Sequence, residues 1–252
     1  MKQFQKDKLT VQIYETRAEM GAAAARDIKA KLAELLAKQP SVNMIFAAAP
    51  SQNEVLQALV SDTSIEWNRV HAFHMDEYIG LEKTAPQGFG NFLRTHIFDL
   101  VPFADVQYID STAVDPDAEA ERYGRLLDEN PTDIALMGIG ENGHIAFNDP
   151  PVADFQDPKT AKPVQLDEIC RQQQVNDGCF ASIDAVPTHA ITLTVPALVK
   201  APHLFCVVPA ATKAAAVYET LNGSIDTHCP ASILRTHADA KLYLDAESAK
   251  RL

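Results

Sequence analysis

Short apolar runs alternate with longer segments of helical periodicity along most of the chain. Residues 15–38 are rich in alanine and carry Met20, Ile28 and Leu32 near helical spacing, which predicts a helix with one apolar stripe. Residues 42–48 form a short apolar run that suits a buried strand. The chain therefore begins with a helix followed by a buried strand.

The same alternation continues to the end of the chain. Further helices are predicted at residues 91–100, 115–129 and 212–221, and further strands at residues 69–75, 106–109, 134–137, 190–194, 204–208 and 241–244. Ser51 and Glu54 have the spacing of a capping box, which predicts that Ser51 caps the next helix. Strands that alternate with helices indicate an α/β fold, single-domain and Rossmann-like over residues 1–252, with a mostly parallel sheet and helices on both faces.

Residues 152–186 depart from this alternation. The segment is polar, contains three consecutive glutamines at residues 172–174 and has few apolar repeats. It is long for a plain connection, so we expect an active-site lid. The alternative is a disordered surface loop.

Composition and the cysteines narrow the class of protein. Hydrophobic residues make up 46% of the 252 residues, enough for a sizeable core. No window approaches the roughly 18 uninterrupted apolar residues of a membrane span, and the N-terminal residues lack an apolar signal core. The four cysteines form no C-x-x-C pair, and neither Cys170 nor Cys179 has a partner at zinc-finger spacing. We expect free thiols, no metal site and a cytoplasmic location.

The formal net charge of −12 excludes some partners. Nucleic-acid binding requires a basic stripe, so no nucleic-acid partner is expected, and no membrane partner either. A phosphorylated ligand would not be attracted by the overall field. It would need a local group of cationic side chains and helix N-termini.

A glycine-rich turn follows the predicted central strand. Gly138, Gly140 and Gly143 match the dinucleotide-binding fingerprint, but that fingerprint must open a helix. The Asn-Asp-Pro-Pro sequence at residues 148–151 disfavours a helix there, so a nicotinamide cofactor is not expected. Glycines allow tight bends and close backbone approach, so Gly140 and Gly143 are predicted ligand-binding positions. The turn also delivers His144, which suits a catalytic group better than a plain surface loop.

Two motifs resemble one enzyme family. Gly-x-Gly-x-x-Gly-His-Ile-Ala-Phe-Asn-acid-Pro at residues 138–150 resembles the signature of glucosamine-6-phosphate deaminases, which share a sugar-phosphate superfamily with 6-phosphogluconolactonases. Met-Asp-Glu-Tyr-Ile-Gly-Leu at residues 75–81 resembles a second deaminase segment, in the family's order and separation. The resemblance extends from the first predicted helix to Leu244. Because lactonases typically continue with Gly-His-Thr, the deaminase branch is the closer one.

The candidate polar residues follow different predicted strands. Asp76, His144, Asp149, Ser51 and Lys213 all come shortly after a strand. Ligands of open α/β sheets bind beyond the carboxyl ends of the strands. We therefore expect these residues to meet on one rim of the sheet.

The resemblance implies a role for each of these residues. Asp76 matches the base that moves a proton from C2 to C1 of the sugar, and His144 matches the group that opens the sugar ring. Lys213 matches the phosphate-binding lysine, and Ser51 and Gln52 offer further donors at a helix N-terminus. The alternatives are a solvated acidic turn, a structural histidine and a solvated lysine.

The chain departs from the family pattern at three places. The glycine-rich phosphate loop is replaced by Pro-Ser-Gln-Asn-Glu at residues 50–54. Asn142 stands where the family has an aspartate beside the histidine, and Asp149 stands where it has a glutamate. These two residues are expected to orient the histidine. The lid arginine that binds phosphate has no clear match, so either Arg171 serves or the glutamines at residues 172–174 replace it.

Three functions remain open on the sequence. The leading one is isomerisation and deamination of a hexosamine 6-phosphate, such as glucosamine 6-phosphate, to a ketohexose 6-phosphate and ammonia, with neither metal nor organic cofactor. The second is lactone hydrolysis of the 6-phosphogluconolactonase type, in which no C2 base is required. The third is a non-catalytic sugar-phosphate-binding regulator. In each case the expected partner is a small phosphorylated sugar, and a homo-oligomer is allowed.

Overall fold

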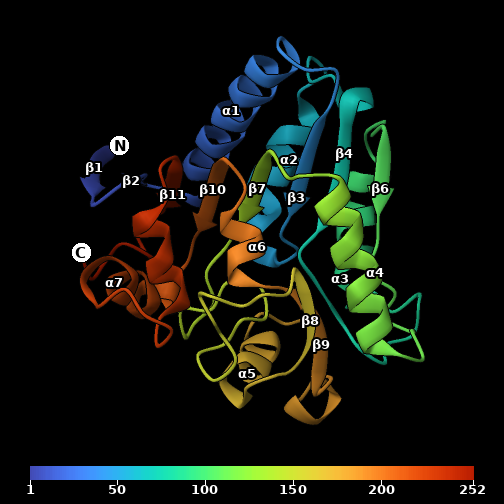
Figure 1. Cartoon of the computed structure of the whole chain (residues 1–252). Helices are drawn as coiled ribbons and strands as arrows, with labels where there is room; N and C mark the ends of the chain where they lie inside the picture. Colours follow the sequence, from blue (N-terminus) through green and yellow to red (C-terminus); the bar gives the residue numbers. More distant parts are fainter.

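Eight strands form the central sheet of the computed structural model, which describes all residues from Met1 to Leu252 (Figure 1). In spatial order they are β1 (Lys2–Lys6), β2 (Leu9–Ile13), β11 (Ala240–Leu244), β10 (His203–Val208), β7 (Ile134–Met137), β3 (Val42–Phe46), β4 (Val70–His74) and β6 (Asp105–Gln107). Neighbouring strands are parallel except β1 and β2, which form an antiparallel hairpin at one edge. This hairpin lies outside the elements predicted from the sequence.

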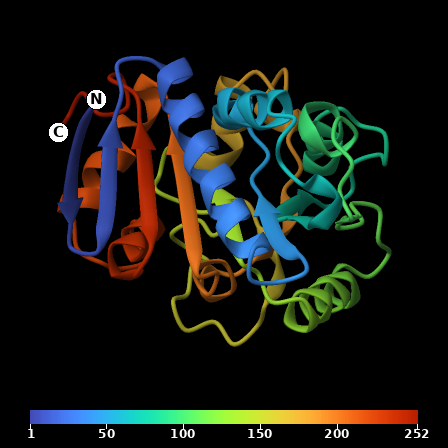
Figure 2. The same cartoon turned by 90° about the horizontal axis from the view of Figure 1, so that it is seen from above.

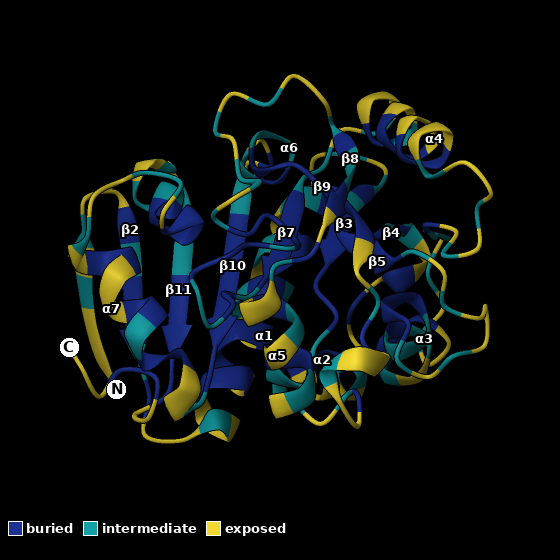
Figure 3. Cartoon of the chain, turned by 90° about the horizontal axis from the view of Figure 1, so that it is seen from below, coloured by how far each residue is buried: buried dark blue, intermediate teal, exposed yellow.

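Helices cover both faces of the central sheet (Figure 2). They are α1 (Arg17–Leu36), α2 (Asn53–Ser61), α3 (Phe89–Leu93), α4 (Pro116–Glu129), α5 (Glu168–Asn176), α6 (Val195–Val199) and α7 (Ala214–Asn222). Successive strand residues point to opposite faces, so Met44 and Phe46 pack in the core under α1 and α2, while Ile45 packs in the core under α4, α6 and α7. The inner strands of the sheet are buried, whereas much of the edge strand β1 and the outer helix surfaces are exposed (Figure 3). The predicted fold class is confirmed. None of the helices is long and apolar enough to cross a membrane.

A second, smaller sheet was not predicted. It consists of β5 (Asp76–Tyr78), β9 (His189–Leu193) and β8 (Ala161–Gln165), all antiparallel to their neighbours. The strand predicted at residues 190–194 therefore exists, but it belongs to this small sheet. Leu193 donates its N–H to the carbonyl of Met75 at 2.8 Å, which joins β9 to the end of β4. Asp76 is held where the two sheets meet.

Residues 152–186 are an ordered part of the fold. The segment contains β8 and α5, followed by a short 3-10 turn at Ile183–Ala185. Its residues Cys170, Gln173 and Gln174 are buried. The alternative of a structureless surface loop is therefore wrong.

The predicted capping box at the start of α2 is also wrong. A 3-10 turn at Pro50–Gln52 precedes α2, so Ser51 lies within the turn, where it caps nothing. Its Oγ instead accepts a hydrogen bond from the Gln52 amide at 3.0 Å. Glu54 forms a bidentate ion pair with Arg17, at 2.8 and 2.9 Å. This pair neutralises the charge of Glu54, which lies in the segment that replaces the family's phosphate loop.

Candidate active site

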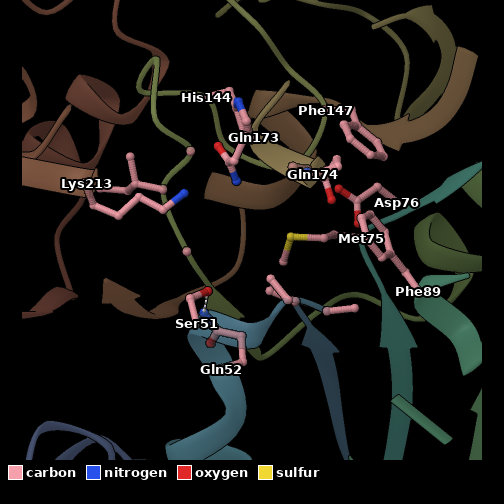
Figure 4. A pocket seen from close by; sticks show the side chains of 17 residues that line it. Ser51, Gln52, Met75, Asp76, Phe89, His144, Phe147, Gln173, Gln174 and Lys213 are labelled. Carbon is pink, nitrogen blue, oxygen red and sulfur yellow. Dashed lines mark hydrogen bonds between the residues drawn. The ribbon is translucent and has the colours of Figure 1, made fainter. Parts of the chain in front are cut away.

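One cavity lies at the carboxyl ends of β3, β4, β7 and β10 (Figure 4). It holds about 510 Å³ of empty space, including its opening to solvent. Of the residues predicted from the sequence, those that line it are Ser51, Gln52, Asp76, Gly140, His144 and Lys213. Met75, Phe89 and Phe147 add apolar surface. The fold therefore brings residues that are far apart in sequence to one rim, as the order of elements indicated.

His144 is fixed by two side chains behind it. Its Nδ1 lies 2.7 Å from Asn142 Oδ1 and 2.9 Å from Asp149 Oδ1. Both oxygens accept hydrogen bonds, so the network assigns the proton to Nδ1 and leaves the lone pair on Nε2. The Asn142 amide also donates to the same Asp149 oxygen at 2.9 Å. Orientation and tautomer are thus set for proton transfer through Nε2.

Asp149 is fully buried behind the imidazole and does not line the cavity. Burial alone would raise the pKa of its carboxyl. Hydrogen bonds from His144 and Asn142, together with attraction to His144, outweigh burial and hold the pKa below its ordinary value. The carboxylate therefore stays ionised at neutral pH, where it stabilises an imidazolium.

Replacing Asn142 by aspartate is expected to make folding stability depend strongly on pH. The variant would put a second carboxylate where an amide now donates to Asp149, and two carboxylates in contact do not both stay ionised without cost. We expect a loss of about 1–3 kcal/mol in the free energy of unfolding near about pH 8, shrinking toward about pH 5 as the pair shares a proton. Denaturant unfolding across this range measures the effect. Asn142→Ala is the uncharged control, and an identical pH dependence in it would contradict the charge argument.

Gly140 leaves room for the histidine ring. A Cβ atom at this position would overlap ring atoms of His144, and the Gly140 N–H donates to the His144 carbonyl at 2.9 Å. Gly140→Ala is expected to displace the imidazole from Asn142 and Asp149 and to reduce turnover on the order of 100-fold with the fold retained. Steady-state kinetics and circular dichroism check this. Gly124→Ala, in α4 away from the cavity, should leave turnover unchanged.

Asp76 faces the cavity with an unpartnered carboxyl. Its side chain is 6% exposed, and its hydrogen bonds are made by the main chain, whose carbonyl accepts from His74 Nδ1 at 2.9 Å. Burial, and then the charge of Glu77, raise the pKa of Asp76 well above its usual value. A buried carboxyl with no protein partner and a raised pKa is well suited to accept a proton from a ligand.

The neighbours of Asp76 build its frame and do not enter the cavity. Glu77 accepts the backbone N–H groups of Tyr78, Phe89 and Gly90, at 2.9, 3.0 and 2.8 Å. It therefore ties β5 to the start of α3. This structural role corrects the alternative of a solvated acidic turn, since both acids are buried.

Lys213 is a buried cation with no ion-pair partner. It is 4% exposed and sits in a 3-10 turn at Ala211–Lys213, just before α7. Burial lowers the pKa of its ammonium, although Asp177 and Glu141 oppose this effect. Ser51 lies at the same end of the cavity (Figure 4). An unpaired buried lysine beside a hydroxyl can bind an anion.

Two predicted ligand-binding residues lie elsewhere. Arg171 donates to the carbonyls of Ile183 and Val186 at 2.7 and 3.1 Å, so its guanidinium is used within the fold and lies outside the cavity. Gly143 also lies outside the cavity wall, and a Cβ there would meet the sulfur of Cys229. Its positive φ of 84° serves the turn.

Two of the three consecutive glutamines line the cavity. Gln173 and Gln174, on α5, both line the cavity and are each 6% exposed. The Gln173 carbonyl accepts the backbone N–H of Glu141 at 2.7 Å. Of the two alternatives, the glutamines and not Arg171 reach the cavity, and their part in binding phosphate stays a prediction.

A thiol also lies against the histidine–aspartate pair. Cys170 Sγ, a ring nitrogen of His144 and a carboxylate oxygen of Asp149 all lie within 4.8 Å of one another. No spacing in the sequence indicated this group of metal-ligand types. Burial, and then the charge of Asp149, raise the pKa of the Cys170 thiol well above its usual value. The thiol is therefore protonated and unreactive at neutral pH.

Known proteins are similar to this chain in sequence and in architecture. A glucosamine-6-phosphate deaminase of Listeria welshimeri is 33% identical over 211 residues, which cover 84% of this chain and 88% of that protein. One from Exiguobacterium sibiricum is 36% identical over 190 residues, covering 75% and 73%. A monomeric glucosamine-6-phosphate deaminase of known structure superposes with a TM-score of 0.88 at 28% identity, covering 95% and 98%.

The fold extends to more distant proteins. A 6-phosphogluconolactonase of Thermotoga maritima superposes with a TM-score of 0.77 at 18% identity, covering 94% of this chain and 100% of that one, a likeness of fold. The profile of a family described as glucosamine-6-phosphate isomerases/6-phosphogluconolactonase matches residues 15–243, nearly the whole chain. With the resemblance of the two motifs thus confirmed, the chain belongs to the family of glucosamine-6-phosphate isomerases and 6-phosphogluconolactonases.

Proposed function

We propose that the protein isomerises and deaminates a hexosamine 6-phosphate, glucosamine 6-phosphate or a close relative, to a ketohexose 6-phosphate and ammonia. The observation that carries this proposal is the unpartnered carboxyl of Asp76 in the same cavity as His144. A C2 base is needed for isomerisation, whereas lactone hydrolysis does not use one. The deaminases of Listeria welshimeri and Exiguobacterium sibiricum are named for the same reaction.

The residues divide the reaction between them. Lys213 and Ser51 bind the phosphate, and Nε2 of His144 moves the proton that opens the sugar ring, with Asp149 stabilising the imidazolium. Asp76 then takes the proton from C2 and returns it to C1, which converts the 2-amino aldose into a 2-imino sugar. Water adds to this imine and ammonia leaves, so one water is consumed for each ammonia released. This sequence requires no redox change.

The surroundings of the cavity support three further parts of the proposal. Residues 152–186 act as a lid on one domain formed by residues 1–252, because α5 supplies cavity wall from this segment. The four cysteines are free thiols, which fits a cytoplasmic location. A homo-oligomer remains a prediction that light scattering can check, and one structural relative is described as monomeric.

A substrate panel tests the proposed function. The purified protein is incubated with the 6-phosphates of glucosamine, galactosamine and mannosamine, and ammonia and ketose phosphate are measured in parallel. Equal amounts of both products from at least one substrate support the proposal. Hydrolysis of 6-phosphogluconolactone without ammonia release would favour the lactonase, especially if Asp76→Asn kept it. Binding without any turnover would favour the regulator.

A further inference from the structure

Three buried polar side chains face the cavity without a partner in the protein. Asp76 and Gln174 are each 6% exposed and Lys213 is 4% exposed, and no hydrogen bond or ion pair within the protein satisfies their side-chain polar atoms. Folded proteins leave few buried polar groups unpaired, and those that remain commonly mark where a ligand binds. These three side chains therefore indicate which polar groups a ligand of this cavity carries.

The three side chains lie at two ends of the cavity. Lys213 and Ser51 occupy one end, and Asp76 and Gln174 project into the half away from Lys213 (Figure 4). One end thus carries a cation and the other a carboxyl. A ligand that satisfies both ends has an anion at one end and a cationic hydrogen-bond donor at the other.

We propose that Gln174 determines substrate specificity by binding the 2-amino group of the sugar together with Asp76. This inference rests on the proposed function, which places C2 at Asp76. The Gln174 carbonyl oxygen accepts a hydrogen bond from the ammonium, and the Asp76 carboxylate supplies the opposite charge. A sugar phosphate with a hydroxyl at C2 would leave the buried carboxylate without a counter-charge, so it binds less well.

An amide suits this position better than a charged group. A second carboxylate beside Asp76 would raise the pKa of the base further by like-charge repulsion and keep it protonated. An arginine would repel the ammonium that this subsite binds. Gln174 offers an acceptor at no cost to the ionisation of Asp76.

Neighbouring glutamines of α5 provide the comparison. The side-chain carbonyl of Gln173 already accepts the backbone N–H of Glu141, whereas that of Gln174 has no partner in the protein. Gln172 is exposed, bonds to Asn176 at 3.1 Å and lies outside the cavity. Gln172→Leu is therefore the matched control for Gln174→Leu, because it makes the same substitution in the same helix at a residue outside the subsite.

Binding of two matched ligands tests the inference. The probes are 2-amino-2-deoxyglucitol 6-phosphate and glucitol 6-phosphate, which differ only in the C2 substituent, and their Kd values are measured by calorimetry. The wild-type protein should bind the amine more tightly. Gln174→Leu should raise the Kd of the amine probe by about tenfold or more and that of glucitol 6-phosphate by less than about threefold. Gln172→Leu should change neither Kd.

Gln174→Glu adds a readout that packing alone would not move. This variant should still bind the amine probe. The acid limb of its profile of kcat against pH should move to higher pH, because the new carboxylate raises the pKa of Asp76. Equal weakening of both ligands in Gln174→Leu, or no weakening, would overturn the amine subsite even with ammonia still produced. Failure of every hexosamine 6-phosphate to release ammonia from the wild type would instead refute the proposed function.

Discussion

Asp76→Asn is expected to reduce kcat for the hexosamine 6-phosphate by about 100- to 10,000-fold, the contribution typical of a positioned general base. The amide keeps the size and shape of the side chain but cannot accept the C2 proton. The variant should be at least as stable as the wild type near neutral pH, because the carboxyl of Asp76 makes no hydrogen bond within the protein and the amide removes the cost of ionising a buried group. Ammonia release under saturating substrate measures kcat, and thermal unfolding measures stability.

Glu77 provides the contrast. Its carboxylate accepts three backbone N–H groups, so Glu77→Gln should lower stability as well as activity. Binding of the ketohexose 6-phosphate product, which has no amine, should not weaken in Asp76→Asn, because the amide removes a buried carboxylate that this ligand leaves without a counter-charge. If Asp76→Asn keeps more than about a tenth of the wild-type turnover, Asp76 is not the base.

The same carboxyl sets the expected pH dependence. A base works only when ionised, and burial raises the pKa of Asp76 above the value of about 3.9 that an exposed aspartate has. As the pH falls, kcat/KM should therefore decline at a higher pH than an ordinary carboxyl would give. A profile that stays flat down to about pH 4 would show that a group other than Asp76 controls this limb.

Much of the site was predictable because it depends on strand order. Each of β3, β4, β7 and β10 appears in the sequence as a short apolar run, and parallel strands present their carboxyl ends on the same side. Residues that follow these runs must therefore converge, and Asp76, His144 and Lys213 do line one cavity. Asn142, His144 and Asp149 lie within eight residues of one another, so their side chains could be expected to contact each other around the histidine.

What the sequence did not reveal depends on contacts made far along the chain. β5 has only three residues and is stabilised by pairing with β9, more than a hundred positions later, so no local pattern marks it. The guanidinium of Arg171 bonds to the carbonyls of Ile183 and Val186, which only the folded segment brings near. The sequence alone leaves open whether Arg171 or the glutamines at residues 172–174 face the ligand, because tertiary packing decides which side of α5 lines the cavity.

Lys213→Met is expected to raise the KM for a hexosamine 6-phosphate by about tenfold or more while making the ligand-free protein more stable. A charge-assisted contact to phosphate contributes roughly 1.5–3 kcal/mol, and no other lysine and no arginine lines the cavity. Without ligand, however, the lysine is a buried charge with no ion-pair partner, and burial lowers its pKa. Methionine has similar bulk and needs no counter-charge, so the free energy of unfolding should rise by about 0.5–2 kcal/mol.

The pH dependence of this stability difference identifies its cause. Because the folded protein holds the pKa of Lys213 below its unfolded value, the wild type gains stability as the pH rises and the buried ammonium loses its proton. The advantage of Lys213→Met should therefore be largest near neutrality and shrink at alkaline pH. Lys200→Met removes the same charge from an exposed position, which separates a local effect from the change in the net charge of −12. An unchanged KM in Lys213→Met would place the phosphate elsewhere, whereas equal changes in both variants would assign the effect to the overall field.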